Sequence, residues 1–191
     1  MIGQFNLDQF ISTITGRTRS LFADDIEANR GRLQERISGR KVLAIGAAGT
    51  IGSSFVKALL PFKPGKVVVV DTNENGLTEL VRDCRSTHGL FIPDEFITYP
   101  VNFSDPVFRR LLNVHGPFDI VANFAAHKHV RSEKDIFSIE AMLENNVFRA
   151  RDLLEALTEH PPAHFFCVST DKAANPANVM GASKKMMEDL I

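Results

Sequence analysis

Short apolar runs alternate with amphipathic helical patterns over most of the 191-residue chain. The runs are continuous stretches of Val, Ile, Ala and Phe, which is typical of strands buried on both faces of a parallel sheet. Strands are predicted at residues 41–46, 66–71, 96–101, 119–124 and 164–169. Helices are expected near residues 50–60, 74–85, 106–112 and 136–157, and a last one from about residue 180. This alternation predicts an α/β fold with a doubly wound parallel sheet.

The first 40 residues follow a different pattern. Apolar residues recur there at helical spacing, and one helix should run from Asp24 or Asp25 to Ile37, where Ser38 and Gly39 form a stop signal. We interpret residues 1–40 as an N-terminal helical appendage to a domain at residues 41–191. It either packs on that domain or forms a subunit interface. Its apolar positions are Phe5, Phe10, Ile11, Ile14, Ile26, Leu33 and Ile37.

Charge and cysteine content exclude several classes of function. The chain has 22 Lys and Arg against 23 Asp and Glu and no basic block, which argues against a nucleic acid or an anionic membrane surface as partner. No apolar run approaches the roughly 20 residues that span a bilayer. The two cysteines, Cys84 and Cys167, lie far apart, so neither a disulfide framework nor a structural zinc site is expected. These features predict a cytoplasmic protein.

Glycines at positions 46, 49 and 52 follow the first predicted strand and open the first helix. This is a GxxGxxG variant of the dinucleotide fingerprint of Rossmann-like folds, in which glycines permit a tight turn and a close approach to a pyrophosphate. The helix N-terminus offers free N–H groups and a positive dipole to the anion. We therefore expect Gly46, Gly49, Thr50, Ile51 and Gly52 to hold a dinucleotide.

Asp71 ends the second predicted strand, 19 residues after Gly52. A carboxylate at this place accepts hydrogen bonds from the adenosine ribose hydroxyls and repels a 2′-phosphate, which favours NAD over NADP. Nearby Arg82 and Arg85 leave NADP open. The alternative is that Asp71 only caps the turn that follows it.

Polar residues follow the fifth predicted strand, in the run from Ser169 to Lys172. Because ligands bind beyond the carboxyl ends of parallel strands, this run should lie beside the cofactor. Met180 and Lys184 are four residues apart and should share one face of the last helix.

Several segments together resemble a known family. GAAGTIG, VVVVD, NFAAHKHV, VSTDKAANPANVMGASK and the early ITGR are similar to the polysaccharide-biosynthesis branch of the extended short-chain dehydrogenase/reductases. The resemblance is to the C5-inverting UDP-N-acetylglucosamine 4,6-dehydratases and related nucleotide-sugar epimerase/dehydratases. It covers nearly the whole chain, and the VSTDKAxNPxNxMG segment is its most specific part.

The resemblance implies a role for each residue of that segment. Met180 stands where most short-chain enzymes have the Tyr of Tyr-x-x-x-Lys, and it cannot transfer a proton. Lys172 would then be the base for oxidation at sugar C4 and would also remove the C5 proton, with its pKa lowered by burial beside Lys184. Thr170 would hydrogen-bond the C4 oxygen, Asp171 would protonate the departing C6 hydroxyl, and Lys184 would hold the nicotinamide ribose.

Further residues receive roles from the same resemblance. It places Ala125 and Ala126 against the cofactor, and Lys128, His129 and Ser169 on the substrate side. Asn102 is a candidate contact of adenine, and Asn145 or Asn146 should brace the active-site loop through backbone hydrogen bonds. Lys128 and His129 alternatively belong to a polar loop that anchors the next helix. His127 and His129 form an H-x-H pair, but no third ligand is suitably spaced, so no metal is expected. Cys167 should be a core residue and not a nucleophile.

Three functions remain open. The first is a nucleotide-sugar 4,6-dehydratase, or its cofactor-binding portion, acting on a UDP-N-acetylhexosamine. The second is an NAD(P)-binding module without turnover. The third is a 4-epimerase, which the Asp171–Lys172 pair disfavours because epimerisation needs no C5–C6 elimination. Enzymes of the family continue for well over a hundred residues beyond the last helix, so the substrate-binding part is expected to be missing here. The appendage and the open sheet edge favour a homo-oligomer.

Overall fold

The computed structural model describes residues 6–20, 22–128 and 133–191, and it divides the chain into two compact units, Met1–Arg36 and Ile37–Ile191. Phe5 and His129 lie outside the described residues.

The first unit is helical. It contains α1 (Leu7–Thr15), α2 (Ala23–Ala28) and most of α3 (Arg30–Ile37). The single helix expected up to Ile37 is interrupted at Asn29, whose side-chain amide donates to the Asp25 carbonyl at 2.8 Å. Such a local bond competes with regular helix. The interpretation of this segment as an appendage stays a prediction.

The second unit contains a five-stranded parallel sheet with the order β3-β2-β1-β4-β5. The strands lie within two residues of their predicted positions and are β1 (Lys41–Ile45), β2 (Lys66–Val70), β3 (Glu95–Tyr99), β4 (Ile120–Asn123) and β5 (His164–Cys167). β2 and β4 are buried throughout and β1 nearly so, whereas β3 and β5, at the edges, are partly exposed. The predicted doubly wound fold is confirmed.

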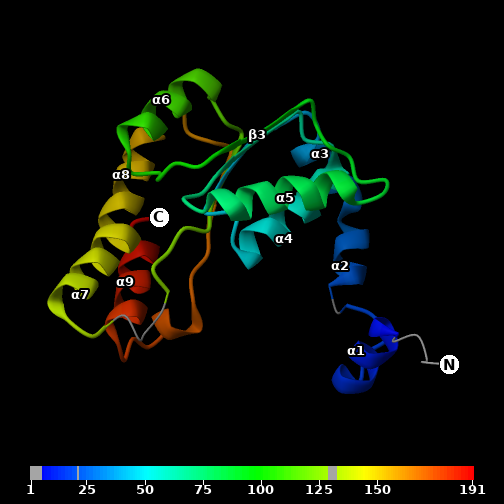
Figure 1. Ribbon diagram of the computed structural model, residues 1–191, viewed down its shortest axis with the longest axis horizontal. Helices are drawn as coiled ribbons and strands as arrows, with labels where there is room; N and C mark the ends of the chain where they lie inside the picture. The colour runs from blue at the N-terminus through cyan, green and yellow to red at the C-terminus, as the bar shows by residue number, and fades with distance from the viewer. Residues whose placement is uncertain (1–5, 21, 129–132) are drawn as a thin grey trace. The chain divides into compact units, whose positions relative to one another are not determined.

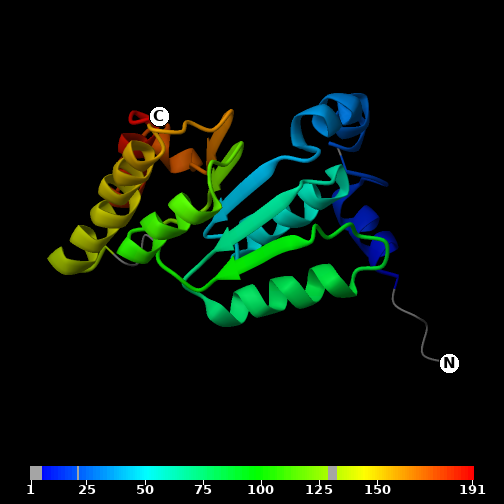
Figure 2. The same ribbon diagram turned by 90° about the horizontal axis from the view of Figure 1, so that it is seen from above.

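Helices cover both faces of this sheet (Figures 1 and 2). One face carries α4 (Thr50–Leu59) and α5 (Glu74–Ser86), and the other carries α6 (Pro106–His115), α7 (Ile136–Leu143), α8 (Arg149–Ala156) and α9 (Val179–Glu188). Short 3-10 turns lie at Leu60–Phe62 and Asp171–Ala173. A hydrophobic core cluster joins the sheet to α6 and α8 and includes Leu43, Val68, Phe108, Val121 and Leu153.

The helix expected at residues 136–157 contains a π-helical segment, Glu144–Phe148, between α7 and α8. Its Asn145, Asn146 and Val147 are buried. A π segment adds one residue to a helical turn and is frequent at functional sites. The insertion therefore gives two buried amide side chains to the inner side of this helix.

β2 lies next to β1 on one side within the sheet, and β4 lies next to β1 on the opposite side. The sheet thus has a topological switch point at β1 and β4, beyond whose carboxyl ends ligands bind in folds of this kind.

Candidate functional site

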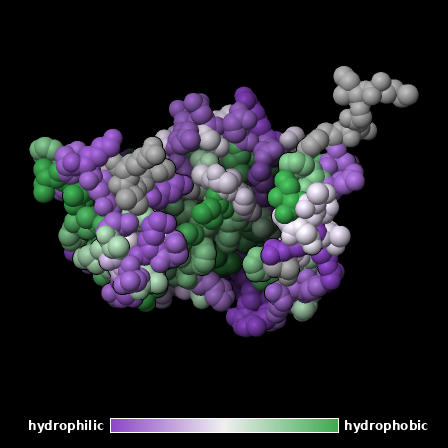
Figure 3. All heavy atoms as spheres, turned by 90° about the horizontal axis from the view of Figure 1, so that it is seen from below, coloured by the Kyte–Doolittle hydropathy of each residue, from purple (hydrophilic) through white to green (hydrophobic). Residues whose placement is uncertain are grey.

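A cavity of about 480 Å³ lies beyond the carboxyl ends of the strands. Its walls come from the loops after β1, β2, β3, β4 and β5 and from α4, α8 and α9. Apolar side chains gather in the hollow at the centre of Figure 3, and polar side chains surround it. This size and this mixture of walls are typical of a small-molecule site. The residues expected to bind cofactor all line it: Gly46, Gly49, Thr50, Ile51, Gly52, Asp71, Asn102, Ala125, Ala126 and Lys184.

At two glycines of the glycine loop, contacts within the protein leave no room for a side chain, and at the third they do leave room. Gly46 has a φ of +70°, and a Cβ there would lie 2.4 Å from the backbone nitrogen of Ala125. A Cβ at Gly52 would lie 2.4 Å from the Cα of Ala47. At Gly49, which caps α4 without a side-chain hydrogen bond, a Cβ would meet only the Gly46 carbonyl at 3.7 Å. The first turn of α4 therefore presents open N–H groups to the cavity. Gly49 lies in front of them, and packing within the protein does not require a glycine there.

The Asp71 carboxylate joins this loop to the end of β2. Its Oδ2 accepts from the backbone N–H of Ala48 at 2.9 Å, and its Oδ1 accepts from that of Asn73 at 2.9 Å. The capping role considered for Asp71 is thus present. Each carboxylate oxygen retains a second lone pair, so the same group can also accept from a ligand hydroxyl.

Asn146 braces the loop after β4, as expected. Its Oδ1 accepts from the backbone N–H of His127 at 2.8 Å, and its Nδ2 donates to the His127 carbonyl at 2.9 Å. Nδ2 also donates to the Ser183 hydroxyl on α9 at 3.0 Å. A second brace was not predicted: Asn123, the last residue of β4, accepts from the Ala125 N–H at 3.0 Å. An Asn at the end of an otherwise apolar strand is the signal that could have revealed it.

Lys184 is buried, with 5% of its surface exposed, and lines the cavity together with Met180. Its ammonium donates to the Met187 sulfur at 3.2 Å, and no carboxylate of the described residues forms an ion pair with it. Burial lowers the pKa of Lys184, although the neighbouring Cys167 and Glu188 act in the opposite direction. A buried cation without a counter-ion is costly, so this position favours a polar ligand that can receive its hydrogen bonds.

Thr170, Asp171 and Lys172 form a hydrogen-bonded turn after β5. The Thr170 hydroxyl donates to Asp171 Oδ1 at 2.9 Å, and the Lys172 ammonium lies 3.3 Å from the same oxygen. These two bonds lower the pKa of Asp171. Thr170 and Lys172 line the cavity, whereas Asp171 is outside the lining and its side chain is 85% exposed.

The burial expected for Lys172 is not found, because its side chain is 46% exposed and paired with Asp171. The remaining expected positions divide as follows. Ser169 and Lys128 line the cavity, while the structure gives no position for His129. The Ser169 hydroxyl oxygen is buried without a hydrogen-bond partner among the described residues.

Cys167 lies on β5 and is partly buried, and burial raises the pKa of its thiol. A raised pKa disfavours the thiolate that a nucleophile needs. Within the described residues, no three His, Cys, Asp or Glu side chains are grouped so that they could hold a metal ion. Nor is any helix in that part of the chain long and apolar enough to cross a bilayer.

Comparison with known proteins now bears on this site. Residues 42–191 match the model of a family described as "Polysaccharide biosynthesis protein". The chain belongs to this family. The resemblance inferred from the sequence is thereby confirmed, since relatives of the family include a named 4,6-dehydratase.

Two curated relatives illustrate the match. The capsular polysaccharide biosynthesis protein CapD of Staphylococcus aureus is 31% identical over 88% of this chain and 27% of its own length. A UDP-N-acetylglucosamine 4,6-dehydratase (inverting) of Campylobacter jejuni is 26% identical over 80% of this chain and 43% of its own length. The chain therefore spans less than half the length of these relatives.

Solved structures share the fold. Pen from Bacillus thuringiensis has a TM-score of 0.67 at 25% identity and matches 81% of this chain and 45% of its own. WbmF of Bordetella bronchiseptica, in complex with NAD+, has a TM-score of 0.60 at 21% identity and matches 81% of this chain and 45% of its own. A metagenomic short-chain oxidoreductase in complex with NADP has a TM-score of 0.66 at 19% identity and matches 81% of this chain and 74% of its own.

Proposed function

We propose that this chain binds NAD or NADP and contributes the cofactor half of the active site, with the acid–base residues, of a nucleotide-sugar 4,6-dehydratase acting on a UDP-N-acetylhexosamine. One observation carries the proposal: a single cavity combines the open glycine loop with Lys184 and with the turn that bears Thr170 and Lys172. The family and the named dehydratase among its relatives support the reaction class.

The cavity fits a dinucleotide on three independent grounds. Gly49 leaves space in front of the amides of α4, where a pyrophosphate would be held. Asp71 has lone pairs for ribose hydroxyls at the end of β2, and this carboxylate favours NAD. Lys184 and the Ser169 hydroxyl both face the cavity with unmet hydrogen-bonding capacity. Lys184 would hold the nicotinamide ribose.

A nicotinamide held by Lys184 would supply the hydride chemistry, with acceptance from sugar C4 and return to C6. Lys172, in its neutral form, would take the proton of the C4 hydroxyl and pass it to Asp171. It would then take the proton of C5 and give it back to C5 when the hydride reaches C6. The Thr170 hydroxyl, which donates to Asp171 Oδ1, would turn to donate to the C4 oxygen. Asp171 would protonate the departing C6 hydroxyl, so that it leaves as water. Because the pKa of Asp171 is lowered, this carboxylate starts ionised, and the proton it delivers must come from Lys172, 3.3 Å away.

Met180 supports the assignment of the base to Lys172. Met180 is buried on the cavity wall at the place where the related enzymes with a Tyr would present a hydroxyl. A thioether neither gives nor takes a proton, so the base must come from another side chain. Lys172 is the lysine of the turn after β5 that lines the cavity.

The test is incubation of the chain with NAD or NADP and UDP-N-acetylglucosamine, followed by mass spectrometry for a product lighter by one water. Turnover that is lost in Lys172→Met and kept in Lys185→Met, an exposed lysine paired with Asp189, supports the proposal. Binding of the dinucleotide without turnover would instead support a non-catalytic module. A product isomerised at C4 without loss of water would indicate an epimerase.

A further inference from the structure

Arg149 is a cation of the cavity wall that sequence reasoning did not single out. It begins α8, directly after the π segment, and its side chain is 28% exposed. Its Nε atom is buried and has no hydrogen-bond partner among the described residues. Arg149 forms an ion pair with Glu144, whose Oε1 lies 3.8 Å from Nε, beyond hydrogen-bond distance. Because Nε is buried, the terminal N–H groups of the guanidinium are the donors that a ligand in the cavity would meet.

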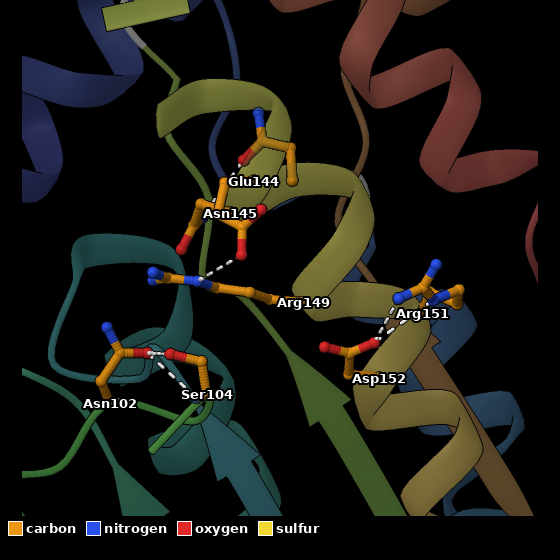
Figure 4. Close-up of polar contacts among 8 residues, drawn as sticks. Asn102, Ser104, Glu144, Asn145, Arg149, Arg151 and Asp152 are labelled. Carbon is orange, nitrogen blue, oxygen red and sulfur yellow. Dashed lines mark hydrogen bonds and ion pairs between the residues drawn. The ribbon is translucent and has the colours of Figure 1, made fainter. Parts of the chain in front are cut away.

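The side chain extends across the cavity. In Figure 4, Arg149 points from α8 toward the loop after β3 that carries Asn102 and Ser104, whereas Arg151 leaves the same helix in another direction and pairs with Asp152. Asn102 and Arg149 both line the cavity. The Asn102 Oδ1 already accepts from the N–H and the hydroxyl of Ser104, which leaves its amide N–H groups as donors. This end of the cavity is therefore rich in donors and calls for a group that carries lone pairs.

The identity of that group follows from the proposed function, on which this inference rests. With the pyrophosphate at the N-terminus of α4 and the ribose at Asp71, the adenine bonded to that ribose must occupy the adjoining wall. That wall comes from the loop after β3 and from α8. A purine offers ring nitrogens with lone pairs and a planar face, which suit a planar guanidinium. A 2′-phosphate is disfavoured because the Asp71 carboxylate stands at the ribose.

We propose that Arg149 forms one wall of the adenine subsite, where the terminal N–H groups of its guanidinium donate to a ring nitrogen of the purine. The residue then determines the preference of the chain for a purine dinucleotide. A pyrimidine lacks the second ring of a purine and the N7 lone pair which that ring carries.

The experiment compares the binding of NAD, NADP and nicotinamide cytosine dinucleotide by calorimetry. The proteins are the unaltered chain, Arg149→Met and the matched control Arg151→Met, which removes an equivalent guanidinium on the same helix. A hydrogen bond from a charged donor corresponds to about tenfold to a hundredfold in affinity. We expect Arg149→Met to lose NAD and NADP affinity by that factor, to leave the cytosine analogue nearly unchanged, and to reduce the purine preference accordingly. Arg151→Met should match the unaltered chain.

The outcomes separate this inference from the proposed function. If the unaltered chain binds no dinucleotide, the proposed function fails and the inference with it. If NAD binds but Arg149→Met keeps the purine preference, only the inference is overturned. A loss of affinity confined to NADP would assign Arg149 to a 2′-phosphate. An equal loss of affinity for all three dinucleotides would assign it to the pyrophosphate. Either result overturns the proposal. Should Arg149→Met not fold, Arg149→Lys keeps the charge but lacks the planar guanidinium, and it must also lose the preference.

Discussion

The Asn146 brace allows a prediction with a magnitude that can be worked from the structure. Asn146 is 2% exposed and makes four hydrogen bonds: two with the backbone of His127, one to the Ser183 hydroxyl and a weak one that it accepts from Asn145. Asn146→Ala removes the three strong bonds as well as the weak one, and it leaves groups that are buried or partly buried without partners. At about 1–1.5 kcal/mol for each bond, we expect the free energy of unfolding to fall by about 3–5 kcal/mol. That loss is a large part of the stability of an ordinary domain, about 5–15 kcal/mol.

Equilibrium unfolding in urea measures this loss. Asn145→Ala is the matched control, because Asn145 is also buried in the π segment but makes a single weak bond, to Asn146 at 3.3 Å. It should cost about 1 kcal/mol. Asn146→Ala should also weaken NAD binding, since the loop after β4 lines the cavity. An Asn146→Ala variant no less stable than Asn145→Ala would show that the brace contributes little and would refute the reasoning.

Three further predictions test other parts of the fold. Gly46→Ala should destabilise the chain by about 2 kcal/mol or more in urea unfolding, because φ at Gly46 is +70° and a Cβ would lie 2.4 Å from the Ala125 nitrogen. Gly49→Ala should leave stability nearly unchanged and weaken NAD binding in calorimetry. Because burial lowers the pKa of Lys184, the folded state holds its proton less well than the unfolded state, so unfolding free energy should rise as pH increases from neutral toward about 10, and Lys184→Met should lack this part of the rise. Burial also lowers the pKa of His115, so stability should fall as pH drops below about 6.5 in a pH series of melting curves, and His115→Phe should flatten that fall.

The sheet was predictable because each strand is a continuous apolar run between turn residues, and such a run has few other ways to bury itself. The glycine loop and Asp71 were predictable for a related reason, since their spacing reflects backbone geometry. The π segment was not, because one inserted residue leaves no mark on helical periodicity over so short a stretch. The break at Asn29 depends on one side chain bonding its own backbone, which a window of apolar spacing does not register.

The position of Arg149 on the cavity wall was not predictable from the sequence, for a different reason. A charged residue on an amphipathic helix normally faces solvent, and the residues around it give no sign that the π segment turns this one toward a cavity. The exposure of Lys172 is likewise a property of the turn in which it sits and of its pairing with Asp171. Side-chain direction in these places depends on tertiary contacts, which a single sequence does not display.

The two backbone bonds accepted by Asp71 limit how cofactor preference can change in this protein. One carboxylate accepts from the amides of Ala48 and Asn73 and, in the proposed function, also faces the ribose. A small or basic residue at this position, the obvious route toward NADP, would release both amides and loosen the loop proposed to hold the pyrophosphate. Asn would supply one acceptor oxygen where two are used. A switch of preference therefore requires compensating substitutions in the glycine loop and in the turn after β2, so single-residue engineering at Asp71 should reduce affinity for both dinucleotides.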